Sequence, residues 1–141
     1  MTTEIPTLGT RVRDDPSGIA WQVHFHLETL RALCGLTDHT LRYRWLHEFG
    51  CPPKEWLMRL RAIEAGNLAE QGRKTEHIAA LLGYTDASHC ARDFRRFYGM
   101  TTYQWRELCR WEPRRAAMIR ARINPLPKWK IEEAQQMAED F

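Results

Sequence analysis

The sequence has little of what marks secreted, membrane-spanning or catalytic proteins. Its four cysteines are scattered over 141 residues without a CxxC pair, which predicts reduced thiols rather than a disulfide framework. No apolar run approaches the ~20 residues that a membrane span needs, and no signal peptide is recognisable. A phosphate-cradling glycine loop, a nucleophile beside a base and a full set of metal ligands are also missing. We therefore expect a cytoplasmic protein without catalytic activity, cofactor, bound metal or membrane partner.

A large excess of charge of one sign is missing too. The chain carries 21 basic and 18 acidic residues, a net charge of +3. This balance excludes a polycation that binds nucleic acid through bulk charge, so any such contact must come from charges gathered on one face. Aromatic residues make up 11% of the chain, with six tryptophans, and predict a folded domain with a sizeable core.

The chain contains an internal repeat. The stretch LRALCGLTDHTLRYRWLHEFGCPPKEW, residues 30–56, aligns with IAALLGYTDASHCARDFRRFYGMTTYQW, residues 78–105. The two copies share a glycine and an aspartate at an offset of 48, then a glycine and a tryptophan at an offset of 49: Gly35/Gly83, Asp38/Asp86, Gly50/Gly99 and Trp56/Trp105. The second copy therefore has one added residue between its two glycines. A duplication of this kind constrains the fold strongly.

Each copy predicts two helices joined by a glycine turn. In the second copy an apolar stripe ends at Gly83, Thr85 or Asp86 can cap the next helix, and Gly99 ends that helix. Its apolar face is predicted at Cys90, Phe94 and Phe97, and its polar face at Ser88, His89, Arg92, Arg95 and Arg96. We therefore predict an all-α fold with two helix-turn-helix units, whose second helices suit the major groove of DNA.

Five parts follow along the chain: an N-terminal arm (1–26), a first helix-turn-helix (27–52), a linker helix (53–72), a second helix-turn-helix (73–112) and a C-terminal extension (113–141). The linker helix, expected from about Pro53 to Gln71, would span roughly 27 Å at about 1.5 Å per residue. Adjacent major-groove segments lie ~34 Å apart. Gly66 near its middle predicts a hinge. For the extension we favour a loosely ordered segment over a short amphipathic helix, extra phosphate contacts or a partner-binding surface.

These patterns resemble the DNA-binding domain of the AraC/XylS family of bacterial transcription regulators, over about residues 27–110. The second copy is similar to the family signature of a Gly-aromatic turn, a Ser-His-aromatic-x-Arg-x-Phe helix and a Gly-x-x-Pro-x-x-Tyr close. The resemblance implies a nucleoid-associated protein of seven helices that binds double-stranded DNA as a monomer, with RNA polymerase or another regulatory protein as a further partner. It implies base-facing positions at Ala87, Ser88, His89 and Arg92 in the second copy and at His39, Arg42 and Tyr43 in the first. Phosphate contacts are implied at Lys54, Arg95 and Arg96.

The first copy departs from the family pattern. Tyr43 stands where the family usually has an arginine, and Arg31 and Arg44 stand where small and apolar residues are usual. We expect the two arginines to lie near one helix crossing without an obvious partner. Before this copy, Trp21, Val23 and Phe25 alternate as in a short N-terminal strand, so the helix that braces the first copy in the family is expected to be absent or replaced.

Other interpretations of the same residues stay open. The arginines of the second copy suit an ordinary solvated helix face, which Asp93 makes less positive. His24 and His26 form a pair typical of metal sites, but no third ligand is evident. The alternative function is a protein-interaction module derived from such a regulator, with the first helix-turn-helix degraded; a milder alternative is DNA binding by the second copy alone. Salt separates DNA from protein partners, because counterion release makes DNA binding weaken steeply as salt rises.

Overall fold

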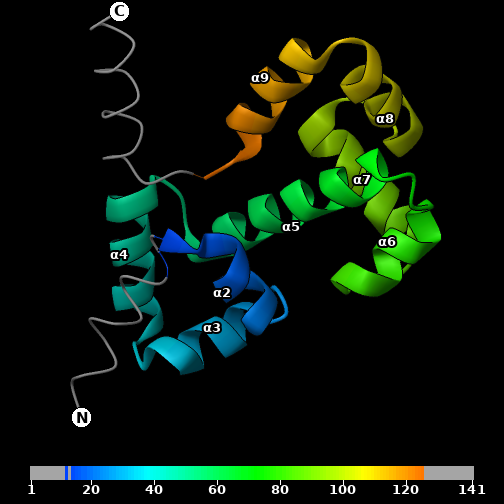
Figure 1. The fold of residues 1–141 in the computed structure, drawn as a ribbon. Coiled ribbons are helices and arrows are strands. Elements are labelled where there is room, and N and C mark those ends of the chain that lie inside the picture. The colour runs from blue at the N-terminus through cyan, green and yellow to red at the C-terminus, as the bar shows by residue number, and fades with distance from the viewer. Residues whose placement is uncertain (1–11, 13, 126–141) are drawn as a thin grey trace, which may run out of the picture. The chain divides into compact units, whose positions relative to one another are not determined.

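The computed structural model describes residues 12 and 14–125, and within this part of the chain it contains eight helices and no strand (Figure 1). The described chain divides into two units, one running up to Leu57 and also including Pro125, the other spanning Met58–Asn124. The first unit holds α2 (Pro16–Gln22), α3 (Leu27–Cys34), α4 (Asp38–Phe49) and the start of α5 (Pro53–Glu70). The second holds the rest of α5, α6 (Thr75–Leu82), α7 (Ala87–Tyr98), α8 (Thr102–Trp111) and α9 (Pro113–Ile123). The all-α prediction is therefore confirmed for the described residues.

The N-terminal region forms a helix where a strand was predicted. Asp15 caps α2, its Oδ1 atom accepting a hydrogen bond from the Gly18 backbone N–H at 3.0 Å. Pro16 takes the first helical position, where its missing N–H costs nothing. A Cβ atom at residue 18 would lie 2.0 Å from Asp15 Oδ2, so a larger residue there would have to displace the Asp15 side chain. Helix α2 therefore begins at an aspartate cap that is followed by a proline and a glycine.

The predicted strand at Trp21, Val23 and Phe25 is wrong. Trp21 lies inside α2, Val23 is its C-terminal cap, and Phe25 has a left-handed backbone with φ of 57°. The alternation of these three aromatic and apolar residues reflects a helix end followed by a tight turn. Ile19, Ala20 and Val23 are buried, so a helix does precede the first repeat in this chain.

The two copies of the repeat have helices of equal length. Helices α3 and α6 both have 8 residues and helices α4 and α7 both have 12, and every one of the four ends at a glycine with positive φ, namely Gly35, Gly50, Gly83 and Gly99. Thr37 caps α4 and Asp86 caps α7. The residue added in the second copy therefore lies in the turn between its helices, which leaves both longer helices the same length.

Matching positions of the two copies form the two cores. Leu41, Trp45 and Phe49 are the buried residues of α4, and Cys90, Phe94 and Tyr98 stand at the same helical positions of α7. Each set packs on a fully buried tryptophan of the next helix, with ring centroids 5.4 Å apart for Phe49 and Trp56 and 4.5 Å for Tyr98 and Trp105. Phe97, predicted to be buried, is only half-buried, and Tyr98 takes its place in the core.

Gly66 permits a close contact rather than a hinge. Helix α5 continues through it from Pro53 to Glu70, within one residue of the expected bounds. The Tyr98 hydroxyl donates a 2.6 Å hydrogen bond to the Ala62 carbonyl, and a Cβ atom at residue 66 would lie 2.2 Å from that hydroxyl oxygen. The glycine is therefore explained by the approach of α7 to α5, and the hinge prediction has no support.

We expect Gly66→Ala to destabilise the protein, although alanine favours a helix over glycine by about 1 kcal/mol. The added methyl group overlaps the Tyr98 side chain, and overpacking of this kind costs about 1–3 kcal/mol. Chemical denaturation would measure the change in the free energy of unfolding in the wild-type and Tyr98→Phe backgrounds. The methyl group should cost less in the Tyr98→Phe background, because the hydroxyl group that it overlaps is gone there. A fully stable Gly66→Ala protein would contradict the contact.

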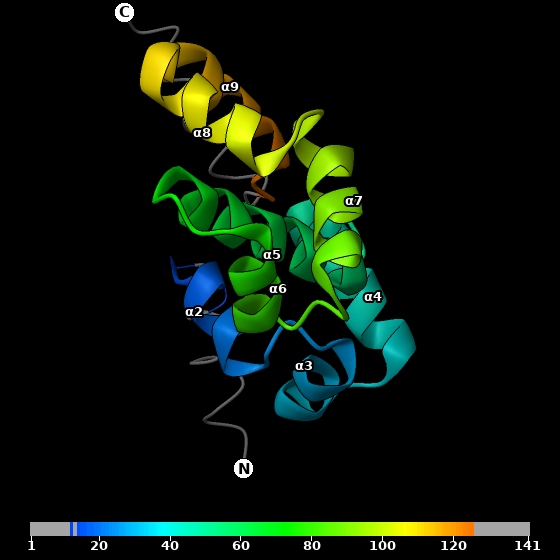
Figure 2. The same cartoon turned by 90° about the vertical axis from the view of Figure 1, so that its right-hand side faces the viewer.

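The preference for a loosely ordered C-terminal extension is wrong for residues 113–123. Helix α9 occupies this segment and lies beside α8 (Figures 1 and 2), burying Ala116 and Ile123. The Arg59 guanidinium of α5 donates hydrogen bonds to the last carbonyls of α9, at 3.1 Å to Arg122 and 3.2 Å to Ile123. This segment, although rich in basic residues, therefore has an apolar side that is buried in the second unit. Residues 126–141 lie outside the described residues.

Candidate nucleic-acid interface

The polar face of α7 lies opposite its buried face. Ser88, Arg92, Arg95 and Arg96 are exposed, whereas Ala87 and His89 are half-buried. In the first unit His39, Arg42 and Tyr43 are exposed on α4, and Lys54 is exposed on the first turn of α5. None of the ten residues predicted to touch DNA is buried, but what they bind stays a prediction.

The start of α7 fixes the His89 ring. The His89 backbone N–H donates to Asp86 Oδ1 at 2.8 Å, and the Thr85 backbone N–H donates to His89 Nδ1 at 3.3 Å. The ring meets the Tyr84 ring edge to face, with centroids 5.2 Å apart. Because Nδ1 acts as an acceptor, Nε2 carries the proton of the neutral ring and is the donor that remains.

Asp93 does not make the polar face of α7 less positive, because its carboxylate is buried on the inner side of that helix. It is 7% exposed, accepts a 3.1 Å hydrogen bond from the Tyr84 hydroxyl at Oδ2, and lies 3.8 Å from Arg61 Nη2. The Arg61 guanidinium in turn lies 4.0 Å from the centre of the Tyr84 ring. We call Arg61, Tyr84 and Asp93 the buried polar cluster. It joins α5 to α7. Because the Asp93 carboxylate is buried there, the charged side chains exposed on the outer face of α7 are the cations Arg92, Arg95 and Arg96.

Burial in and beside this cluster raises the pKa of two weakly acidic groups, the Tyr84 hydroxyl and the Cys90 thiol. Burial, with the adjacent Asp93 charge, raises the pKa of the Tyr84 hydroxyl far above its ordinary value. Burial and the same carboxylate raise the pKa of the Cys90 thiol to about 11. Tyr84 therefore remains a hydrogen-bond donor throughout the physiological pH range, and Cys90 is a neutral core residue, as expected from its apolar helix position.

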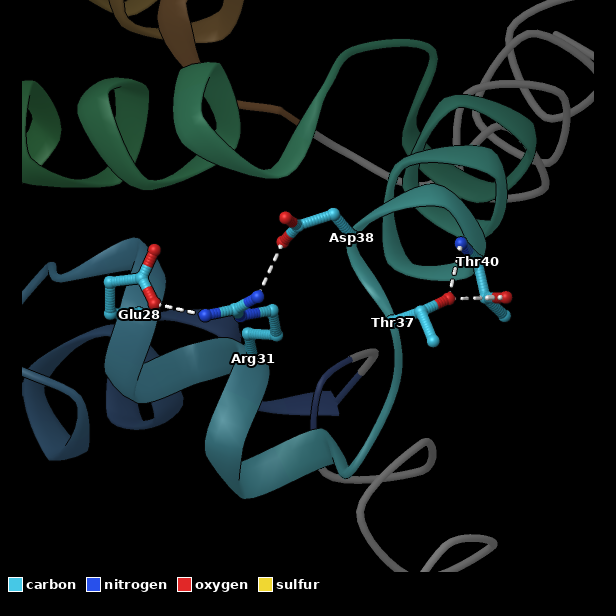
Figure 3. Close-up of polar contacts among 5 residues, drawn as sticks. All are labelled: Glu28, Arg31, Thr37, Asp38 and Thr40. Carbon is cyan, nitrogen blue, oxygen red and sulfur yellow. Dashed lines mark hydrogen bonds and ion pairs between the residues drawn. The ribbon is translucent and has the colours of Figure 1, made fainter.

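Arg31 has partners, contrary to expectation. Its guanidinium pairs with Glu28, one turn earlier on α3, and with Asp38 at 3.1 Å, the first residue of α4 (Figure 3). The hydrogen bond to Glu28 and the charges of both carboxylates raise the pKa of Arg31. Beside this pair, Thr37 Oγ1 accepts the Thr40 backbone N–H at 3.3 Å (Figure 3). The arginine therefore ties the scaffold helix of the first copy to the start of its second helix.

The equal lengths of α4 and α7 identify matching positions on their outer faces. Ser88 corresponds to His39 and Arg92 to Tyr43, which is 67% exposed. Tyr43 stacks on His47, with ring centroids 6.4 Å apart. The two helices thus share a scaffold but present different chemical groups at the same places.

A second group of cations lies at the starts of α6 and α8, and sequence reasoning did not single it out. Arg73, Lys74 and Arg106 line a cavity of about 400 Å³. Arg73 and Lys74 belong to the segment between α5 and α6, outside the aligned repeat, while Arg106 follows its last matched residue. No local sequence pattern groups these three cations, because they share a cavity only where the start of α6 meets the start of α8, at the hydrogen-bonded Thr75 and Thr102.

The described residues contain no group of three or more histidine, cysteine, aspartate or glutamate side chains that could hold a metal ion. Among the helices described, none combines the length and the apolar character that crossing a bilayer requires.

Comparison with known proteins identifies a family. Residues 30–108 match the family model described as a helix-turn-helix domain, which covers both repeats and more than half of the chain. No curated protein and no solved structure matches the chain significantly.

Proposed function

Because the chain belongs to the AraC/XylS family of helix-turn-helix DNA-binding domains, we propose that it regulates transcription by binding a specific site on double-stranded DNA through α7 and α4. The carrying observation is the outer face of α7. It presents Ser88 and Arg92 to solvent, while Cys90, Phe94 and Tyr98 hold the opposite face in the core. Polar side chains near the start of a helix are the groups that reach base edges in the major groove.

The side chains of α7 offer distinct contacts. Arg92 can place two N–H groups on the O6 and N7 atoms of a guanine. His89, whose Nδ1 atom is already engaged by Thr85, can donate from Nε2 to a base acceptor such as guanine N7 or thymine O4. Arg95 and Arg96 lie further along the helix and suit phosphates, which position the protein without selecting a sequence.

The first unit would supply the second recognition helix. His39, Arg42 and Tyr43 are exposed on α4, and Lys54 would contact a phosphate from the start of α5. Helix α5 has 18 residues, about 27 Å at 1.5 Å per residue, against ~34 Å between adjacent major-groove segments. We therefore propose that the units within residues 27–52 and 73–112 bind successive groove segments as one monomer, without catalysis.

Arg92→Ala is expected to cost about 1–3 kcal/mol of DNA-binding free energy and to relax preference at one base pair, whereas Arg96→Ala should weaken all sequences alike. In vitro selection from random duplexes, followed by titration of the selected site, would measure both effects. Tyr43→Ala is the matched variant in the first unit, and it should relax preference in a separate half of the site. All three residues are exposed, so thermal melting should stay unchanged. An Arg92→Ala protein with intact affinity and preference would refute this role of α7.

The alternative of a protein-interaction module loses two of its grounds. Arg31 is paired with Glu28 and Asp38, and helix α2 precedes the first repeat. The first helix-turn-helix also has helices of the same lengths as the second, and they end at glycines in the same way. Selection that enriched no DNA motif, together with salt-insensitive capture of a protein such as RNA polymerase, would favour the alternative.

A further inference from the structure

Two cavities adjoin on the second unit at one pair of threonines. The first, the α6 cavity, is lined by Arg73, Lys74, Glu76 and Arg106 together with Thr75 and Thr102. The second, the α7 cavity, has a volume of about 380 Å³ and is lined by Arg92, Arg95 and Thr101 together with the same Thr75 and Thr102. The hydroxyl oxygens of Thr75 and Thr102 are 3.1 Å apart and hydrogen-bonded, so this pair separates the two cavities.

The charge around the threonine pair is strongly positive. Five cations, Arg73, Lys74, Arg92, Arg95 and Arg106, line the two cavities against a single acid, Glu76. All five are exposed, and none forms an ion pair with another of the described residues. The +3 net charge of the whole chain is therefore unevenly distributed, with a concentration of unpaired positive charge at this place.

Two contacts place hydrogen-bond donors at the walls of these cavities. Arg106 lies against Gly72, where an added Cβ atom would be 3.0 Å from the guanidinium carbon. Of the two threonine hydroxyl groups, one donates to the other, which leaves the second O–H free to donate to a bound group. Guanidinium, ammonium and hydroxyl donors converging on one place are the groups that bind phosphate oxygens.

We propose that the α6 and α7 cavities bind phosphates of one DNA strand at the edge of the groove that α7 enters, with Arg73 and Arg106 as the main contacts of the α6 cavity. The proposal rests on DNA binding by α7. A strand explains the arrangement better than a single free phosphate does, because two adjoining cavities match a row of anionic groups, with Arg73, Lys74 and Arg106 in one cavity and Arg95 in the other. Arg92, whose side chain lines the α7 cavity, belongs at the same time to the face of α7 assigned to base contacts.

The test is the salt dependence of DNA affinity for an Arg73→Ala/Arg106→Ala double variant. Each phosphate contact contributes about 0.9 to the slope of log affinity against log salt, or roughly 3.5-fold between 50 and 200 mM. We expect the slope to fall by about 0.9 to 1.8, so that the variant loses about 3.5- to 12-fold less affinity over this range than the wild type. The loss at low salt should be the same for a selected duplex and for an unrelated one.

The matched control removes two cations from α9, as Arg114→Ala/Arg115→Ala. Both residues are exposed and line neither cavity. The proposal is overturned by an unchanged slope in the first variant, by an equal change in the control, or by a changed base preference. It is also overturned if pyrophosphate alone binds the wild type but not the variant while the DNA slope stays the same. A reduced slope on random duplexes without any selected motif would support the cavities and refute sequence-specific recognition, which keeps the two ideas separable.

Discussion

Replacing Asp93 with alanine is expected to lower the free energy of unfolding by about 3–5 kcal/mol, because removing one partner of a buried ion pair leaves the other charge uncompensated. The Arg61 side chain is only 15% exposed, and Asp93 Oδ2 is its partner at 3.8 Å. The same change removes the acceptor of the buried Tyr84 hydroxyl, and an unsatisfied buried donor adds to the loss. Urea unfolding followed by circular dichroism would measure the effect.

Two further variants separate charge from packing in this cluster. Asp93→Asn keeps an acceptor for Tyr84 but removes the charge that faces Arg61, so its loss should be intermediate. Asp93→Leu combined with Arg61→Met removes both charges, so it should lose less than Asp93→Ala; the loss that remains is that of the Tyr84 hydroxyl, which still lacks its acceptor. If Asp93→Ala unfolded at the same urea concentration as the wild type, the cluster would contribute nothing to stability.

Trp105→Ala is expected to cost about 3–5 kcal/mol, the usual loss when a large buried aromatic side chain leaves a cavity. The Trp105 side chain is fully buried, packs on Tyr98 and lies below the Arg120 guanidinium. It also donates a 3.1 Å hydrogen bond from Nε1 to the Gly66 carbonyl. Thermal melting would register the change as a large fall in the transition temperature of the second unit.

The duplication supplies a control for the hydrogen bond. Trp56 stands at the matching place of the first unit and is equally buried, but its Nε1 atom has no hydrogen-bond partner among the described residues. Trp105→Phe should therefore cost about 1 kcal/mol more than Trp56→Phe, because only the first change removes a hydrogen bond. Equal losses would mean that the bond to Gly66 adds no stability.

Much of the fold could be predicted because its pattern occurs twice in the chain. Glycines at matching places located the ends of four helices, and Trp56 and Trp105 marked the same core position in both copies. A pattern that occurs once is less reliable, as the residues before the first repeat illustrate. There, three alternating apolar residues predicted a strand, although the Asp15 cap, with Pro16 and Gly18 after it, begins a helix.

The candidate site was predictable only where its residues share one helix face. Exposure of Ser88 and Arg92 follows from helical periodicity. Periodicity places Asp93 beside the apolar face, three residues after Cys90, but it does not reveal the partners of the buried carboxylate, a cation from α5 and a hydroxyl from the turn. The same limit hid Arg73 and Arg106, which come from different segments and line one cavity where Thr75, at the start of α6, is hydrogen-bonded to Thr102, at the start of α8.

The longer turn of the second copy has a consequence for how the two halves can diverge. In the first copy a leucine and a threonine fill the space between the glycine and α4, and the threonine serves as the cap. The additional position gives the second copy three residues with separate tasks: Tyr84 bonds to Asp93, Thr85 orients His89, and Asp86 caps the helix. One extra codon thus allows the cap and the contacts of the turn to reside on separate residues in the second copy. Its histidine gains a fixed ring orientation, for which the shorter turn has no additional residue.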